Sequence, residues 1–145
     1  MSYTYDELQK IKTKLEKDLS KKKAEILNSS FGNLRSRISK ARNTIEDLVY
    51  VKAKLLKYTL DNNEVDTKGH ENIFRLALLI DLNKTILNVQ TTEFLHPTKP
   101  SRRAKLNIMK KVQREIDQIK EKRNEFNCKK VEDDKIKEIL DRLHK

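Results

Sequence analysis

The chain has 145 residues and a net charge of +11, from 33 basic and 22 acidic side chains, but only two glycines and two prolines. Because strand-rich folds need frequent turns, and turns draw on glycine and proline, this composition excludes them and favours long helices with few connections. Charged residues make up 38% of the chain and apolar residues 36%, a balance typical of extended helical proteins, and the length fits one domain.

Compartment and membrane association follow from a few local features. The single cysteine, Cys128, cannot form an internal disulfide, which favours a reducing compartment. The N-terminus is polar and charged, so we expect no signal peptide, and the longest unbroken apolar run, 76–80, is too short to cross a bilayer. We therefore expect a soluble intracellular protein, cytoplasmic or nuclear (nucleoid-associated in a bacterium), that has no membrane partner.

The first predicted helix covers residues 4–28. Thr4 and Glu7 have the spacing of a capping box, and apolar residues from Leu8 to Ile26 then fall on one narrow face. Residues 28–32 contain asparagine, serine and glycine, which indicate a helix stop or a kink. The first two helices can therefore be separate or form one kinked rod.

The second predicted helix covers residues 30–60 and has the most regular apolar spacing, with steps of three and four residues. Its apolar stripe widens toward the C-terminal half, as in a core-facing bundle helix rather than a two-stranded coiled coil. The same seam can also pair between chains, which makes it a candidate partner interface. Its residues are Phe31, Leu34, Ile38, Ile45 and Leu48.

The third predicted helix, residues 69–90, is the most apolar part of the chain. Within 73–89 only Arg75, Asp81 and Lys84 carry charge. A helix that is apolar nearly all round must be covered on several sides. We therefore expect this helix to be central, with the amphipathic helices around it.

Two prolines, Pro97 and Pro100, predict an irregular linker over residues 91–100. Ser101 can cap a helix over 101–127, and Asp133 or Asp134 can begin a short last helix over 132–144. Because no glycine or proline separates these two segments, one long bent helix is the alternative. Residues 1–145 are therefore predicted to form a single all-α domain, an antiparallel bundle of four to five helices of which two or more are long.

Enzyme signatures are weak or missing. Gly32 and Gly69 stand alone, so there is no glycine-rich loop for a phosphate. His70 and Glu71 lack the second histidine of a zinc-binding helix. The residues Glu93 and His96 have the spacing used in di-iron bundles, but the companion motif is absent. We expect no enzyme activity, catalytic residue, metal, cofactor or small-molecule substrate.

Basic residues are the stronger signal. No acidic residue occurs between Phe94 and Arg114, and the 100° helical step places Arg103, Lys110 and Arg114 in one stripe opposite the apolar face. One face of this helix can therefore be buried while the other meets phosphates. A second acid-free window, 26–45, holds two arginines on one flank, and residues 21–23 form the densest lysine cluster. The candidate nucleic-acid-binding residues are Arg102, Arg103, Lys105, Lys110, Lys111, Arg114, Arg35, Arg42, Lys21, Lys22 and Lys23.

The pattern favours a small basic helical protein that associates with nucleic acid, as an accessory or adaptor subunit of a replication, transcription or RNA-handling complex. Lysine and arginine would release counterions from backbone phosphates. The aromatic residues are not interleaved with the basic ones, so strong sequence readout is not expected. DNA and RNA, single- or double-stranded, all fit. The alternative is a helical scaffold that binds a partner protein or forms a homodimer through its apolar seams.

Overall fold

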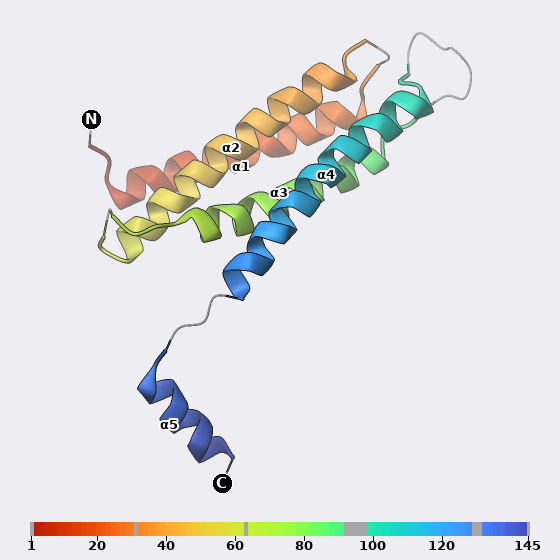
Figure 1. Ribbon diagram of the computed structural model, residues 1–145. Helices are drawn as coiled ribbons and strands as arrows, with labels where there is room; N and C mark the ends of the chain where they lie inside the picture. The colour runs from red at the N-terminus through yellow and green to blue at the C-terminus, as the bar shows by residue number, and fades with distance from the viewer. Residues whose placement is uncertain (1, 31, 63, 92–98, 129–131, 145) are drawn as a thin grey trace.

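The computed structural model describes residues 2–30, 32–62, 64–91, 99–128 and 132–144. Within this part the chain forms helices and no strand, which confirms the predicted all-α class. Figure 1 shows the helices in chain order. They are α1 (Tyr5–Leu27), α2 (Leu34–Thr59), α3 (Lys68–Leu87), α4 (Arg102–Asn127) and α5 (Asp134–Leu143). The predicted linker 91–100 lies mostly outside the described residues.

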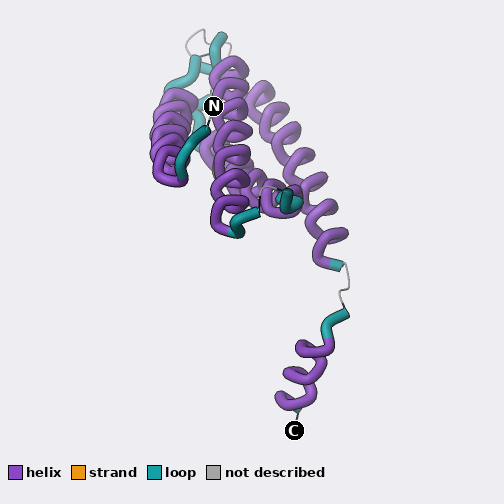
Figure 2. Tube along the Cα trace, turned by 90° about the vertical axis from the view of Figure 1, so that its left-hand side faces the viewer, coloured by secondary structure: helices purple, strands orange, loops and turns teal. Residues whose placement is uncertain are grey.

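The bundle is antiparallel, as predicted. α1 packs against α2, α2 against α3, and α3 against α4, so each helix runs opposite to its neighbour in the chain, and α1 also contacts α3 (Figure 1). α3 therefore contacts α1, α2 and α4. α5 takes part in none of these packed pairs and lies apart from the other helices in both views (Figures 1 and 2).

The two ends of α1 show why it is a separate helix. At the start, the Glu7 backbone N–H donates to the Thr4 hydroxyl at 3.1 Å, and the Thr4 N–H donates to the Glu7 carboxylate at 3.1 Å, which confirms the capping box. At the other end, the Asn28 side chain donates to the Ala24 carbonyl and Arg37 of α2 donates to the Glu25 carbonyl. These bonds add side-chain donors to carbonyls of the last turn, where the regular backbone donors of the helix run out.

The core is built around α3. Leu76, Leu79, Leu82 and Ile86 are buried in it, together with apolar residues of α1, α2 and α4. The other helices bury α3 less completely than expected: Ile73 is 38% exposed and Leu87 is 57% exposed. The exposed residues of α3 from Ile73 to Leu87 lie along one flank of the helix, and α5 lies apart from it (Figures 1 and 2).

The predicted partner seam of α2 lies inside this core. Leu34, Ile38, Ile45 and Leu48 are each at most 4% exposed, whereas Phe31 lies outside the described residues. Their side chains already pack within the same chain. Pairing between chains through this seam would therefore require the bundle to open.

α5 is a separate amphipathic helix. The Ile136 backbone N–H donates to the Asp133 carboxylate at 3.1 Å, so Asp133 is the N-cap. Ile136, Leu140 and Leu143 are 52%, 49% and 73% exposed. Its apolar face is thus open to solvent.

A polar cluster joins α1 to α2. Thr44 is buried, and its hydroxyl donates to the Asp18 carboxylate at 3.2 Å and accepts from the Lys22 ammonium. Lys22 also pairs with Asp18 at 2.7 Å. The hydrogen bond from Lys22 holds the pKa of the Asp18 carboxyl below its usual range.

This lowered pKa predicts a pH-dependent contribution to stability. A carboxyl whose pKa is lower in the folded state stabilises the fold above its ordinary pKa, and the contribution disappears as the pH falls through the lower folded value. Urea unfolding of the parent and of Asp18→Asn should therefore give a constant difference in the free energy of unfolding near neutral pH. That difference should shrink in acid, below the usual aspartate range. A difference that does not change with pH would contradict the role given to the Lys22 bond.

Candidate nucleic-acid interface

The outer face of α4 carries the predicted basic stripe. The inner face is buried through Ile108, Val112, Ile116 and Ile119, at 1–7% exposure. The helical step places Arg103, Lys110 and Arg114 on the opposite side, and all three are exposed. None of them forms an ion pair with a carboxylate of the described residues. Their charge is therefore open to solvent.

The stripe changes sign along the helix. Beyond Arg114, the same outward side carries the exposed acidic residues Asp117 and Glu121. The basic stripe made by Arg103, Lys110 and Arg114 is thus confined to the N-terminal half of α4. In the sequence, this boundary coincides with the end of the acid-free window at Arg114.

Lys105 does not belong to the exposed stripe of Arg103, Lys110 and Arg114, because its side chain is turned toward α3. Its ammonium donates to the backbone carbonyls of Leu87 and Val89, the latter at 3.0 Å. It therefore satisfies carbonyls at the C-terminal end of α3, where a positive charge also suits the helix dipole. Its first role is to fasten α4 to α3. Arg102, the first residue of α4, is exposed.

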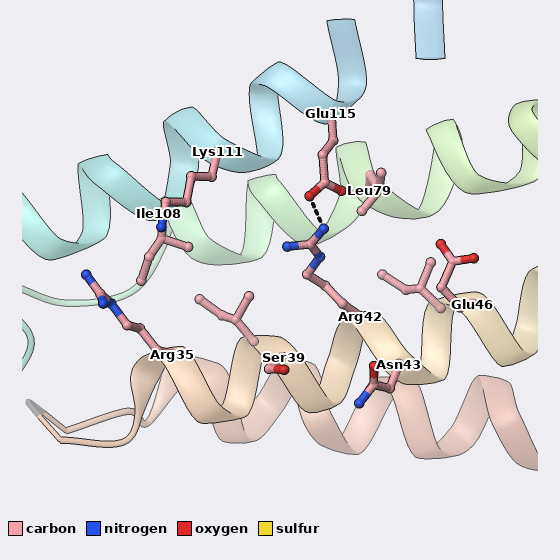
Figure 3. Close-up of a pocket in the computed structure, with 11 residues that line it drawn as sticks. Arg35, Ser39, Arg42, Asn43, Glu46, Leu79, Ile108, Lys111 and Glu115 are labelled. Carbon is pink, nitrogen blue, oxygen red and sulfur yellow. Dashed lines mark hydrogen bonds and ion pairs between the residues drawn. The ribbon is translucent and has the colours of Figure 1, made fainter. Parts of the chain in front are cut away.

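A groove of about 370 Å³ lies between α2 and α4 (Figure 3). Arg35 and Arg42 come from the α2 wall and Lys111 comes from the α4 wall, so the two arginines share a flank as predicted. Apolar side chains from three helices form its floor. They are Ile38, Ile45, Leu79 and Ile108.

The two carboxylates of the groove are each paired with one arginine. Glu115 of α4 forms an ion pair with Arg42 across the groove (Figure 3). Glu46 accepts two hydrogen bonds from Arg75, at 2.7 and 2.9 Å. These hydrogen bonds are the main reason why the pKa of the Arg75 guanidinium is raised. Arg35 and Lys111 are exposed and have no carboxylate partner among the described residues. The groove therefore keeps a positive rim.

The lysine cluster of α1 is largely used within the bundle. Lys22 pairs with Asp18, and Lys23 pairs with Asp81 of α3. Lys21 is exposed. Lys22 and Lys23 are therefore already paired with carboxylates of the bundle. This makes the lysine cluster the weaker part of the predicted nucleic-acid interface.

The structure adds no metal-binding cluster in the part of the chain that it describes. No group of three or more histidine, cysteine, aspartate or glutamate side chains there is arranged to hold a metal ion. Glu93 and His96 lie outside the described residues, and Cys128 is exposed. Among the described helices, none has the length and apolar character needed to cross a membrane.

Comparison with known proteins finds no matching family model, no similar curated protein and no similar solved structure.

Proposed function

We propose that the chain binds the phosphate backbone of nucleic acid with the outer face of α4, as an accessory or adaptor subunit of a larger complex. One observation carries this proposal: Arg103, Lys110 and Arg114 share one exposed face, and no carboxylate of the described residues neutralises them. Solvated cations of this kind are available to phosphates, whereas paired ones must first lose a partner.

The physics of the contact is electrostatic. The net charge of +11 attracts a polyanion at long range, and each phosphate that is neutralised releases counterions. With a rise of about 1.5 Å per residue, the three cations extend over roughly 16 Å of helix. A rigid helix holds them in line, and its apolar face is anchored on α3. The face is thus a preformed contact for a run of phosphates.

Weak sequence readout follows from where the tyrosines lie. Tyr5 and Tyr58 form an edge-to-face pair, with ring centroids 6.2 Å apart, where α1 begins and α2 ends. Tyr3 lies at the same end of the bundle, where its backbone carbonyl accepts a hydrogen bond from the Tyr58 hydroxyl. Tyr50 also belongs to α2. None of these rings is on α4 beside the basic stripe, where a base-stacking platform would need them.

Co-purification of the full chain from native extract, with and without nuclease, tests the proposal. We expect the chain to elute with nucleic acid and to lose it after nuclease treatment. Direct binding to a labelled single strand or duplex at low salt is the second readout. A chain that is free of nucleic acid in extract and unretained at low salt would overturn the proposal.

Self-association as a scaffold is the second candidate function. The buried α2 seam does not favour it, but the exposed apolar face of α5 does, through Ile136, Leu140 and Leu143. Two copies of an amphipathic helix can bury such faces against each other. Sedimentation of the full chain at micromolar concentration should then give a dimer that becomes a monomer when these three residues are replaced by serine. A parent that sediments as a monomer would leave the nucleic-acid proposal as the only one.

A further inference from the structure

We propose that the groove between α2 and α4 is a second phosphate site, which takes a phosphodiester of single-stranded nucleic acid, and that Glu115 occupies it when no nucleic acid is bound. This inference rests on the proposed function, because it assigns the same ligand class to a surface beside the α4 face. The observation behind it is the Arg42–Glu115 ion pair across the groove, next to two cations, Arg35 and Lys111, that have no carboxylate partner among the described residues (Figure 3).

Charge in the groove favours an anion. Arg35 and Arg42 reach it from α2, and Lys111 reaches it from α4. Of the two carboxylates in the groove, Glu46 is held by Arg75 through two hydrogen bonds. Glu115 alone is therefore left to face three cations, so the groove keeps an excess of positive charge, which favours an anion.

The size of the groove favours a single strand. At about 370 Å³ it is at the small end of the range for small-molecule pockets, roughly 300–1,000 Å³. A double helix cannot enter such a space, whereas one phosphate with its attached sugar or base can. The floor of Ile38, Leu79 and Ile108 is apolar, which suits the face of a base or sugar.

Glu115 can be displaced with little cost. Carboxylate and phosphate oxygens make the same kind of paired hydrogen bonds with a guanidinium group, so a phosphate can replace the glutamate on Arg42. The side chains of Arg42 and Glu115 are 39% and 36% exposed, so the released carboxylate remains in contact with water. Exposed ion pairs of this kind contribute little to stability.

The test is a gain of binding on Glu115→Gln, measured by fluorescence anisotropy with a labelled oligothymidine and with a labelled duplex. Freeing one cation for a single strand should raise the affinity about fivefold at about 0.1 M salt, because each such contact adds roughly 0.7 to the salt slope. Arg42→Gln in the Glu115→Gln background should remove the gain. The gain should also be smaller on the duplex, which stays outside the groove.

Glu16→Gln is the matched control. It makes the same charge change on α1, where it releases Lys12 from an ion pair of 3.9 Å, away from the groove. Thermal unfolding checks that each variant is folded. A gain for Glu115→Gln no larger than for Glu16→Gln overturns the inference, and so does a gain that persists without Arg42 or that is equal on the duplex.

The outcomes separate the two proposals. If the parent binds through Arg103, Lys110 and Arg114 but Glu115→Gln gains nothing, the groove site is wrong and the proposed function stands. If replacing those three residues has no effect while the gain depends on Arg42, the groove is a phosphate site and the proposal for the outer face of α4 is wrong. If neither the parent nor Glu115→Gln binds either probe, both proposals are overturned.

Discussion

Replacing Arg103, Lys110 and Arg114 by glutamate is expected to abolish nucleic-acid binding while the helical content stays unchanged. Each lost contact to a single strand should cost about fivefold in affinity at about 0.1 M salt, so three should cost about 100-fold, and the new negative charges add repulsion. All three side chains are exposed and unpaired within the described residues, so the fold does not depend on them. Anisotropy titration and circular dichroism measure the two effects.

The chain offers a matched control for this variant. Lys10, Lys14 and Lys17 are exposed on α1, share one side of that helix, and form no ion pair with a described carboxylate. Their replacement by glutamate changes the net charge by the same amount. We expect a much smaller loss of affinity for this control. An equal loss for both variants would mean that total charge, and not the α4 face, controls binding.

The second large effect concerns the core. Leu82→Ala should lower the free energy of unfolding by about 2–5 kcal/mol, because Leu82 of α3 is 1% exposed within the core and its truncation leaves a cavity. Leu87→Ala, five residues further along the same helix, should change it by about 0.5 kcal/mol or less, because Leu87 is 57% exposed. Urea unfolding measures both. Similar costs at the two positions would contradict the central placement of α3.

Local periodicity was enough to predict the helices and the exposed side of α4. The Thr4–Glu7 spacing predicted the start of α1, and the 100° step from the buried Val112 and Ile116 placed Arg103 and Lys110 on the outside. Such features depend on residues within one or two turns, although the same periodicity placed Leu106, which is 43% exposed, on the apolar face in place of the buried Ile108. They can therefore be predicted without knowing how the helices pack.

Features that depend on the packing of distant segments could not be predicted in this way. Arg42 and Glu115 are 73 residues apart, and their ion pair exists only because α2 and α4 flank α3. Lys105 belongs to the acid-free window like its neighbours, yet it binds carbonyls at the end of α3. The open flank at Leu87 has the same origin, because composition shows that α3 is apolar but not where the other helices end.

The most direct test of the central claim, that the outer face of α4 contacts phosphates, is the salt dependence of affinity for a labelled single strand. It compares the parent with a variant in which Arg103, Lys110 and Arg114 are replaced by alanine. The logarithm of the parent's affinity should fall linearly with the logarithm of salt concentration, and the variant's slope should be shallower by about 2, or roughly 0.7 for each lost contact. Equal slopes for the two proteins, or a parent that does not bind at low salt, would contradict it.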